Sequence, residues 1–110
     1  MEIITSNKEL EQSEIYQLTL SPEIQKMRDI VDAELTIVNY CIYTDNDSDG
    51  KEQTLLSVMT DDGDVYATNS GTFIRSFKKI VEMLGTPKRI KIVSGTSKAG
   101  RAYIDCVWKA

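Results

Sequence analysis

The sequence predicts a small, mainly β domain that contains one clearly marked helix. Three observations support this prediction: five runs rich in β-branched and aromatic residues, an Asp62-Gly63 turn between two of these runs, and one stretch of helical periodicity over residues 73–84. The length of 110 residues fits one domain, because domains cluster near about 100–150 residues. With 41% hydrophobic and 27% charged residues, the chain has the composition of a globular protein.

The N-terminal 31 residues give weaker signals. Residues 7–17 fit a helix and residues 15–20 fit a strand, so both interpretations stay open. Ser21-Pro22-Glu23 is clearer, since a capping Ser, a Pro at the first helical position and an acid in the first turn are typical of a helix start. We therefore expect a short helix from Ser21 to about Val31.

Three strands are predicted next. Residues 34–43 are apolar on both strand faces, which is typical of a central strand in a sandwich or of one that bends through a closed barrel. A polar loop over residues 45–51 leads to a second strand at Gln53–Thr60. The Asp62-Gly63 turn then predicts a hairpin with a third, short strand at Val65–Asn69.

A helix and two further strands complete the prediction. An apolar stripe at helical spacing runs from Phe73 to Leu84, with Ser70 or Thr72 as the cap and Gly85 as the end. The fourth and fifth strands are expected at residues 89–93 and 102–108, joined by a turn over residues 95–100.

This order of three strands, one helix and two strands is the order of the OB-fold. We therefore predict a five-stranded OB-fold-like barrel over residues 32–110, with one helix between strands 3 and 4. Residues 1–31 are expected to be an N-terminal extension with a short helix, within the same domain. A plain antiparallel sheet with one packed helix would give the same order of elements.

The charge of the chain is divided between its two parts. Residues 1–70 hold fifteen acidic and four basic side chains, whereas residues 71–110 hold two acidic and nine basic ones, so net charges of −11 and +7 sum to the overall −4. Such asymmetry indicates a surface for a polyanion. The basic residues alternate with aromatic and apolar ones, a mixture that favours single-stranded nucleic acid over a duplex.

The sequence lacks the residues of common catalytic and cofactor sites. It has no His, no Cys-x-x-Cys, no glycine-rich phosphate loop and no Gly-x-Ser-x-Gly elbow, so we expect neither enzymatic activity nor a cofactor. The Asp45–Gly50 run is similar to the start of a calcium loop, but Leu56 stands where that loop needs a bidentate Glu, so a solvated loop is expected. Cys41 and Cys106 are expected to be reduced, buried thiols.

Strand parity indicates which side chains could meet a nucleic acid. With Ile90 and Ile92 toward the core, Arg89 and Lys91 face outward, and matching of apolar positions turns Tyr103 to the same side. An exposed ring beside cations suits an unstacked base and its phosphate. The predicted nucleic-acid-binding residues are Tyr66, Arg89, Lys91, Lys98, Arg101 and Tyr103. The alternative for Tyr103 is a role in cross-strand packing.

Tyr66 is expected to face outward, on the assumption that Val65 and Ala67 face inward, and Trp108 is expected in the core. Tyr40 and Tyr43 lie on opposite parities, so at most one of them can face a binding groove. The basic residues of the predicted helix are expected on its solvated face; they are Arg75, Lys78 and Lys79.

Residues 33–108 resemble the small OB-fold type of bacteriophage single-stranded-DNA-binding proteins. The matching pieces are the first strand over residues 35–43, the turn and strand over residues 62–67, the Ser70-Gly71-Thr72 helix start and, most specifically, the Gly-Thr-Ser turn hairpin over residues 92–103. The resemblance implies protection of exposed single strands during phage DNA replication or recombination, in the host cytoplasm. The N-terminal segment and the acidic first part differ from the family.

The predicted function is therefore sequence-tolerant single-stranded DNA binding by aromatic stacking and phosphate contacts. The expected partners are single-stranded DNA and replication or recombination proteins, with no membrane; free sheet edges allow a homodimer. The alternative is an OB-like protein-interaction module that uses its acidic surface and binds no nucleic acid.

Overall fold

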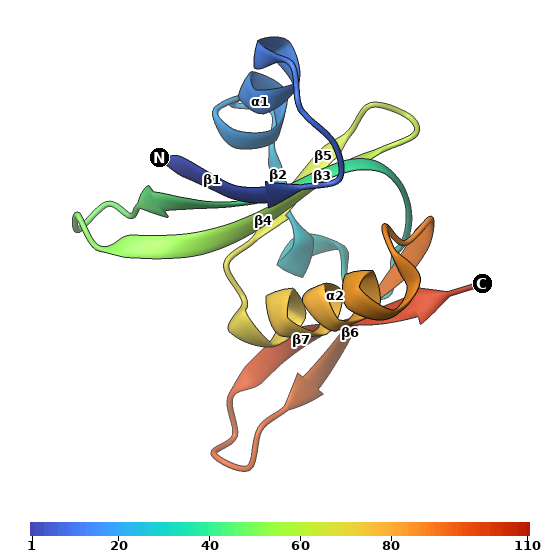
Figure 1. Cartoon of the computed structure of the whole chain (residues 1–110). Coiled ribbons are helices and arrows are strands. Elements are labelled where there is room, and N and C mark those ends of the chain that lie inside the picture. Colours follow the sequence, from blue (N-terminus) through green and yellow to red (C-terminus); the bar gives the residue numbers. More distant parts are fainter.

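The computed structural model describes all 110 residues, which form seven strands, two α-helices and one short 3-10 helix, η1 (Figure 1). In chain order the elements are β1 (Glu2–Ser6), α1 (Gln12–Thr19), β2 (Gln25–Lys26), η1 (Met27–Ile30), β3 (Glu34–Asn46), β4 (Glu52–Thr60), β5 (Val65–Thr68), α2 (Gly71–Leu84), β6 (Arg89–Thr96) and β7 (Ala102–Lys109). The sequence predicted five of these strands; the two that it missed, β1 and β2, are short and lie before residue 31.

The sheet is curled into a half-barrel around β3. Its strand order is β2-β5-β4-β3-β6-β7, and β1 also pairs with β3. Residues 37–46 of β3 pair with β4, whereas residues 34–36 pair with β6, and the register shifts between Ile37 and Asn39. Such a bulge bends its strand, so β3 can pair with β4 in one half of the curled sheet and with β6 in the other half. The last strands of the order, β2 and β7, do not pair, and the sheet stays open there.

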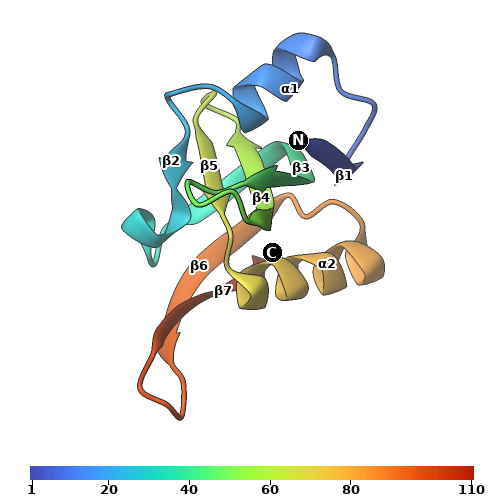
Figure 2. The ribbon, with the colours of Figure 1, turned by 90° about the vertical axis from the view of Figure 1, so that its left-hand side faces the viewer.

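Apolar side chains cover both faces of β3, as its sequence predicted. The main core lies on the inner face, where the Tyr40 ring meets Phe77 of α2 edge-on at 4.9 Å between centroids. A second, smaller core lies on the other face, where Leu18 of α1 packs with Cys41 and Tyr43. The N-terminal residues therefore form a layer over the back of the sheet (Figure 2).

The helix α2 forms where its sequence predicted it. Ser70 caps its start by accepting a hydrogen bond from the Phe73 N–H at 3.2 Å, and Gly85 ends it with a φ of 75°. The same Ser70 hydroxyl donates to the carbonyl of Ile104 at 3.3 Å. This contact holds the start of α2 against β7.

The predicted helix over residues 21–31 is wrong. Ser21 does accept a hydrogen bond from the Glu23 N–H at 3.2 Å, but this bond closes only a turn. The chain then runs alongside β5, with Gln25 opposite Tyr66, before a single 3-10 turn buries Met27. In place of the helix that the capping pattern indicated, the segment forms a short strand paired with β5 and a 3-10 turn that buries Met27.

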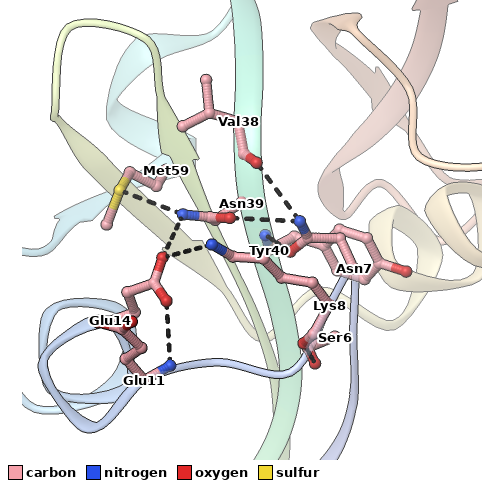
Figure 3. A network of polar contacts seen from close by, with 9 residues as sticks. All are labelled: Ser6, Asn7, Lys8, Glu11, Glu14, Val38, Asn39, Tyr40 and Met59. Atoms are coloured by element: carbon pink, nitrogen blue, oxygen red, sulfur yellow. Dashed lines mark hydrogen bonds and ion pairs between the residues drawn. The ribbon is translucent and has the colours of Figure 1, made fainter.

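The open question about residues 1–20 is answered by one strand and one helix. The helical interpretation of residues 7–17 is right for residues 12–17, and the helix continues to Thr19; the strand lies at Glu2–Ser6 rather than at residues 15–20. Polar contacts hold this segment to the bulge of β3 (Figure 3): Asn39 donates to Glu14 at 3.0 Å and accepts from Asn7 at 3.2 Å. Lys8 forms an ion pair with Glu14 at 3.0 Å.

The two cysteines are free and buried, as predicted. Cys41 lies in the second core and Cys106 in the main core, on opposite faces of the sheet. Burial raises the pKa of each thiol to about 12. Neither α1 nor α2 has the length and apolar character that a membrane-spanning helix needs.

Candidate nucleic-acid interface

The β6–β7 hairpin projects from the body of the molecule, with its turn far from α1 (Figures 1 and 2). Cross-strand pairs such as Ile92 with Cys106 fix which side chains share a face, and the buried pairs face the main core. The residues of the opposite, outer face are Arg89, Lys91, Val93, Gly95, Tyr103, Asp105, Val107 and Lys109. The predicted parity of this hairpin is confirmed, with Tyr103, Lys91 and Arg89 on one side.

Tyr103 is opposite Gly95, and its ring lies against that glycine. The absence of a side chain at Gly95 provides the space that the ring occupies. Even so, 39% of Tyr103 is exposed. The cross-strand packing considered for Tyr103 is therefore present, and part of the residue remains exposed to solvent.

Lys91 and Arg89 share the face of Tyr103 but do not lie beside it. Lys91 is four residues from Gly95 along β6, a separation of roughly 13 Å at the usual rise of a strand. The pair formed by Val93 and Asp105 lies between them. The expectation of a ring in contact with two cations is thus corrected to a track in which ring and cations are spaced along the strand.

Lys98 and Arg101 lie in the exposed turn of the hairpin. The turn is closed by hydrogen bonds from the Ser97 N–H to the Arg101 carbonyl at 2.8 Å and from the Arg101 N–H to Ser97 Oγ at 3.1 Å. Gly100 adopts a φ of 80°, which favours glycine. Both cations are therefore carried on a tight turn at the far end of the outer face.

The basic side chains of this region have no carboxylate partners within the molecule. The only ion pair of the structure joins Lys8 to Glu14, at the other end of the chain. Two acids lie nearby: Glu34 is opposite Lys91, and Asp105 accepts hydrogen bonds from Ser76 of α2 and from the Cys106 N–H. The bond to Ser76 draws the Asp105 carboxylate toward α2.

The predicted outward orientation of Tyr66 is wrong. Tyr66 is paired with the buried Val58 and packs against the main core, while Val65 faces the second core under α1. Its hydroxyl lies 3.4 Å from a carboxylate oxygen of Asp64. Partial burial, followed by the charges of Asp64 and Asp62, raises the pKa of Tyr66. These acids make the surroundings of Tyr66 unfavourable for a phosphate.

Of the three other aromatic residues considered, Tyr40 and Tyr43 agree with the expectation that at most one of them faces a groove, and Trp108 differs in part. Tyr40 and Tyr43 are both buried, and of the two only Tyr43 lines an open cavity, beside β2 and β5. Trp108 has the inward parity that was predicted, opposite Ile90, but 46% of it is exposed. Trp108 lies beyond Cys106 on β7, and the main core does not extend far enough along this strand to cover it.

The remaining charged segments lie outside the hairpin face. The helix cations are exposed, as predicted; they are Arg75, Lys78 and Lys79. In the loop between β3 and β4, Asp47 accepts hydrogen bonds from the N–H groups of Asp49 and Lys51 at 2.9 and 3.0 Å. The Asp47 side chain of this acidic loop therefore forms its hydrogen bonds within the loop's own turn.

The sequence did not single out Arg28, which the structure brings close to the hairpin. Arg28 of η1 and Tyr103 line one open cavity of about 430 Å³, together with Ser94 and with residues 68–70. Only four cations occur in residues 1–70, and two of them, Lys26 and Arg28, are separated by a single residue. The close spacing of these two cations was the signal available in the sequence, but the helix predicted over residues 21–31 gave no reason to interpret it as a shared site.

Comparison of the chain with protein-family models, with curated proteins and with solved structures gave no match.

Proposed function

We propose that this protein binds single-stranded DNA, with little dependence on sequence, along the outer face of the β6–β7 hairpin. The observation that carries the proposal is the setting of Tyr103: its ring is seated on Gly95, 39% of the residue is exposed, and it shares a face with unpaired cations. The phosphate-binding residues of the proposal are Arg89, Lys91, Lys98 and Arg101.

The proposal extends to the fold. We infer that β3, β4, β5, α2, β6 and β7 together correspond to a five-stranded OB-like barrel, to which β1, α1 and β2 are added. Barrels of this order commonly bind oligonucleotides and oligosaccharides. The added N-terminal layer covers the back of β4 and β5, and this favours the hairpin as the working surface.

The chemistry of the face suits an unpaired strand. Stacking of one base on an aromatic ring contributes about 1–3 kcal/mol and depends little on the base. If about four to six phosphates are neutralised, the affinity should fall with salt at a log–log slope of roughly −3 to −4. A two-stranded ribbon can also enter a duplex major groove, but stacking on Tyr103 requires an unpaired base.

The biological setting of the proposal comes from the hairpin over residues 92–103, which resembles that of phage single-stranded-DNA-binding proteins. We propose that the protein covers exposed single strands during phage DNA replication or recombination. Tyr66 has no part in this mechanism, because its ring packs against the main core beside Asp62 and Asp64.

A gel-shift titration tests the proposed function. Labelled single- and double-stranded oligonucleotides of one sequence are titrated with the full chain at low salt. The proposal predicts a shift of the single strand at lower protein concentration than the duplex. An unchanged mobility of the single strand at tens of micromolar protein, or a preference for the duplex, would contradict it. The first of these results would favour the protein-interaction alternative instead.

A further inference from the structure

Two open cavities share lining residues at the end of β5. The first, of about 450 Å³, lies among the end of α1, β2 and β5, and the second, of about 430 Å³, lies among η1, residues 68–70 and the base of the β6–β7 hairpin. Both are lined by Arg28, Thr68 and Asn69. We call the two neighbouring cavities together the Arg28 groove; the first lies on the side of the second core, with Tyr43, and the second on the side of the main core, with Ile104.

The charge of the Arg28 groove is opposite to that of the chain around it. Residues 1–70 hold fifteen acidic and four basic side chains, yet no Asp or Glu lines either cavity. Two of those four basic residues, Lys26 and Arg28, line the groove, and both are exposed. Pairing of Lys26 with Ala67 of β5 fixes this arrangement. The groove is therefore a cationic site within the acidic part of the protein.

The rest of the lining mixes hydrogen-bonding groups with apolar surface. Besides Tyr103, the hydroxyl and amide side chains are Thr19, Ser21, Gln25, Thr68, Asn69, Ser70 and Ser94. Tyr43 and Leu55 contribute apolar area to the first cavity, and Val31 and Ile104 to the second. A single strand presents anionic phosphates, polar base edges and flat apolar base faces, and each of these finds a matching group in the lining.

We propose that the Arg28 groove binds the part of a single strand that continues from Tyr103, so that Lys26 and Arg28 contact its phosphates. Tyr103 lines the second cavity, which places the proposed stacking residue at one end of the groove. The inference rests on the proposed function and extends it: the strand crosses from the basic hairpin into the Arg28 groove.

A comparison of short and long oligonucleotides tests the groove. Lys26→Gln and Arg28→Gln are titrated with labelled oligo-dT of about four and about twelve nucleotides, within the site sizes of OB-folds. Lys51→Gln is the matched control, since it removes one positive charge from the same acidic part but lies outside the groove. Each groove variant should weaken binding of the longer oligonucleotide about fivefold at 0.1 M salt, as expected for one lost phosphate contact. The shorter oligonucleotide should bind the groove variants with the same affinity as it binds wild type.

The outcomes separate this inference from the proposed function. If wild type binds neither oligonucleotide, the proposed function fails and the groove fails with it. If wild type binds both and the two groove variants behave like Lys51→Gln, the groove inference is overturned while the proposed function stands.

Protection of an introduced thiol from maleimide labelling provides a second test, in which no charged side chain is removed. Both native cysteines are buried, so Asn69→Cys introduces a single accessible thiol into the groove, and Ser48→Cys introduces one in the loop between β3 and β4. Bound oligo-dT should slow maleimide labelling of Asn69→Cys and leave Ser48→Cys unchanged. Equal labelling rates of Asn69→Cys with and without saturating oligonucleotide would overturn the inference.

Discussion

The ring of Tyr103 occupies the space that a side chain at Gly95 would need. A Cβ atom on Gly95 would stand 2.5 Å from both Cζ and the hydroxyl oxygen of Tyr103, closer than such atoms approach in proteins. The two residues face each other across β6 and β7. The glycine therefore determines where the ring lies, and through the ring it determines the proposed stacking surface.

Replacement of Gly95 by Ala should displace the ring without unfolding the hairpin. The clashing atoms belong to the far end of a side chain, and the φ of Gly95 lies outside the range that only glycine tolerates. We expect Gly95→Ala to lose part of the stacking contribution of about 1–3 kcal/mol to oligo-dT binding. Gly71→Ala, which has open space around its Cβ, is the control. Equal affinities of the two variants in a fluorescence titration would contradict this role.

Lys91→Ala should reduce the salt dependence of DNA binding, with less effect on the stacking of bases on Tyr103. Loss of one phosphate contact on a single strand reduces the log–log salt slope by about 0.7. Titrations between about 50 and 200 mM salt measure this slope. Lys79→Ala on the solvated face of α2 should leave it unchanged. A slope equal to that of wild type in Lys91→Ala would remove this residue from the track.

Asn39→Ala should loosen the N-terminal layer while leaving DNA binding intact. The variant removes two hydrogen bonds of a buried side chain, one to Glu14 and one from Asn7; at about 0.5–1.5 kcal/mol for each bond, the expected loss is about 1–3 kcal/mol. Denaturant unfolding should show a loss of this size, and limited proteolysis should cleave before β2 sooner than in wild type. Asn46→Ala, at the exposed end of β3, is the control. Unchanged unfolding would show that the network is not stabilising.

The stability of the fold should decrease in alkaline solution. Burial raises the pKa of Cys41 and Cys106 to about 12, above the ordinary value of 9.0. The folded state therefore keeps protons that the unfolded state releases, and the resulting stability is present below pH 9 and is lost as the pH rises toward 12. Each thiol should contribute a loss of about 2 kcal/mol at about pH 10.5. Denaturant titrations at two pH values measure it, with a smaller loss expected in Cys106→Ala.

Elements with local signals were predictable from the sequence. The Ser70 cap, the apolar stripe and Gly85 bound α2 as expected, and the alternation of Ile90 and Ile92 fixed the outer face of the hairpin. These signals depend on neighbouring residues in the chain, so they do not require knowledge of the tertiary structure.

Features that depend on packing between distant segments were not predictable. Val65 and Tyr66 exchange their expected faces because Leu18 of α1 forms a second core on the back of the sheet. The capping pattern at Ser21 gives a turn because Gln25 pairs with β5. The Arg28 groove depends on this pairing of distant segments, so it could not be predicted from the sequence.

The most direct test of the central claim is the affinity of Tyr103→Ala for fluorescently labelled oligo-dT, measured at several salt concentrations. Tyr16→Ala is the matched control, since Tyr16 is 51% exposed on α1, away from the hairpin. We predict a loss of about 1–3 kcal/mol for Tyr103→Ala with an unchanged salt slope, and wild-type affinity for Tyr16→Ala. Wild-type affinity in Tyr103→Ala would contradict the claim that the hairpin face binds the strand.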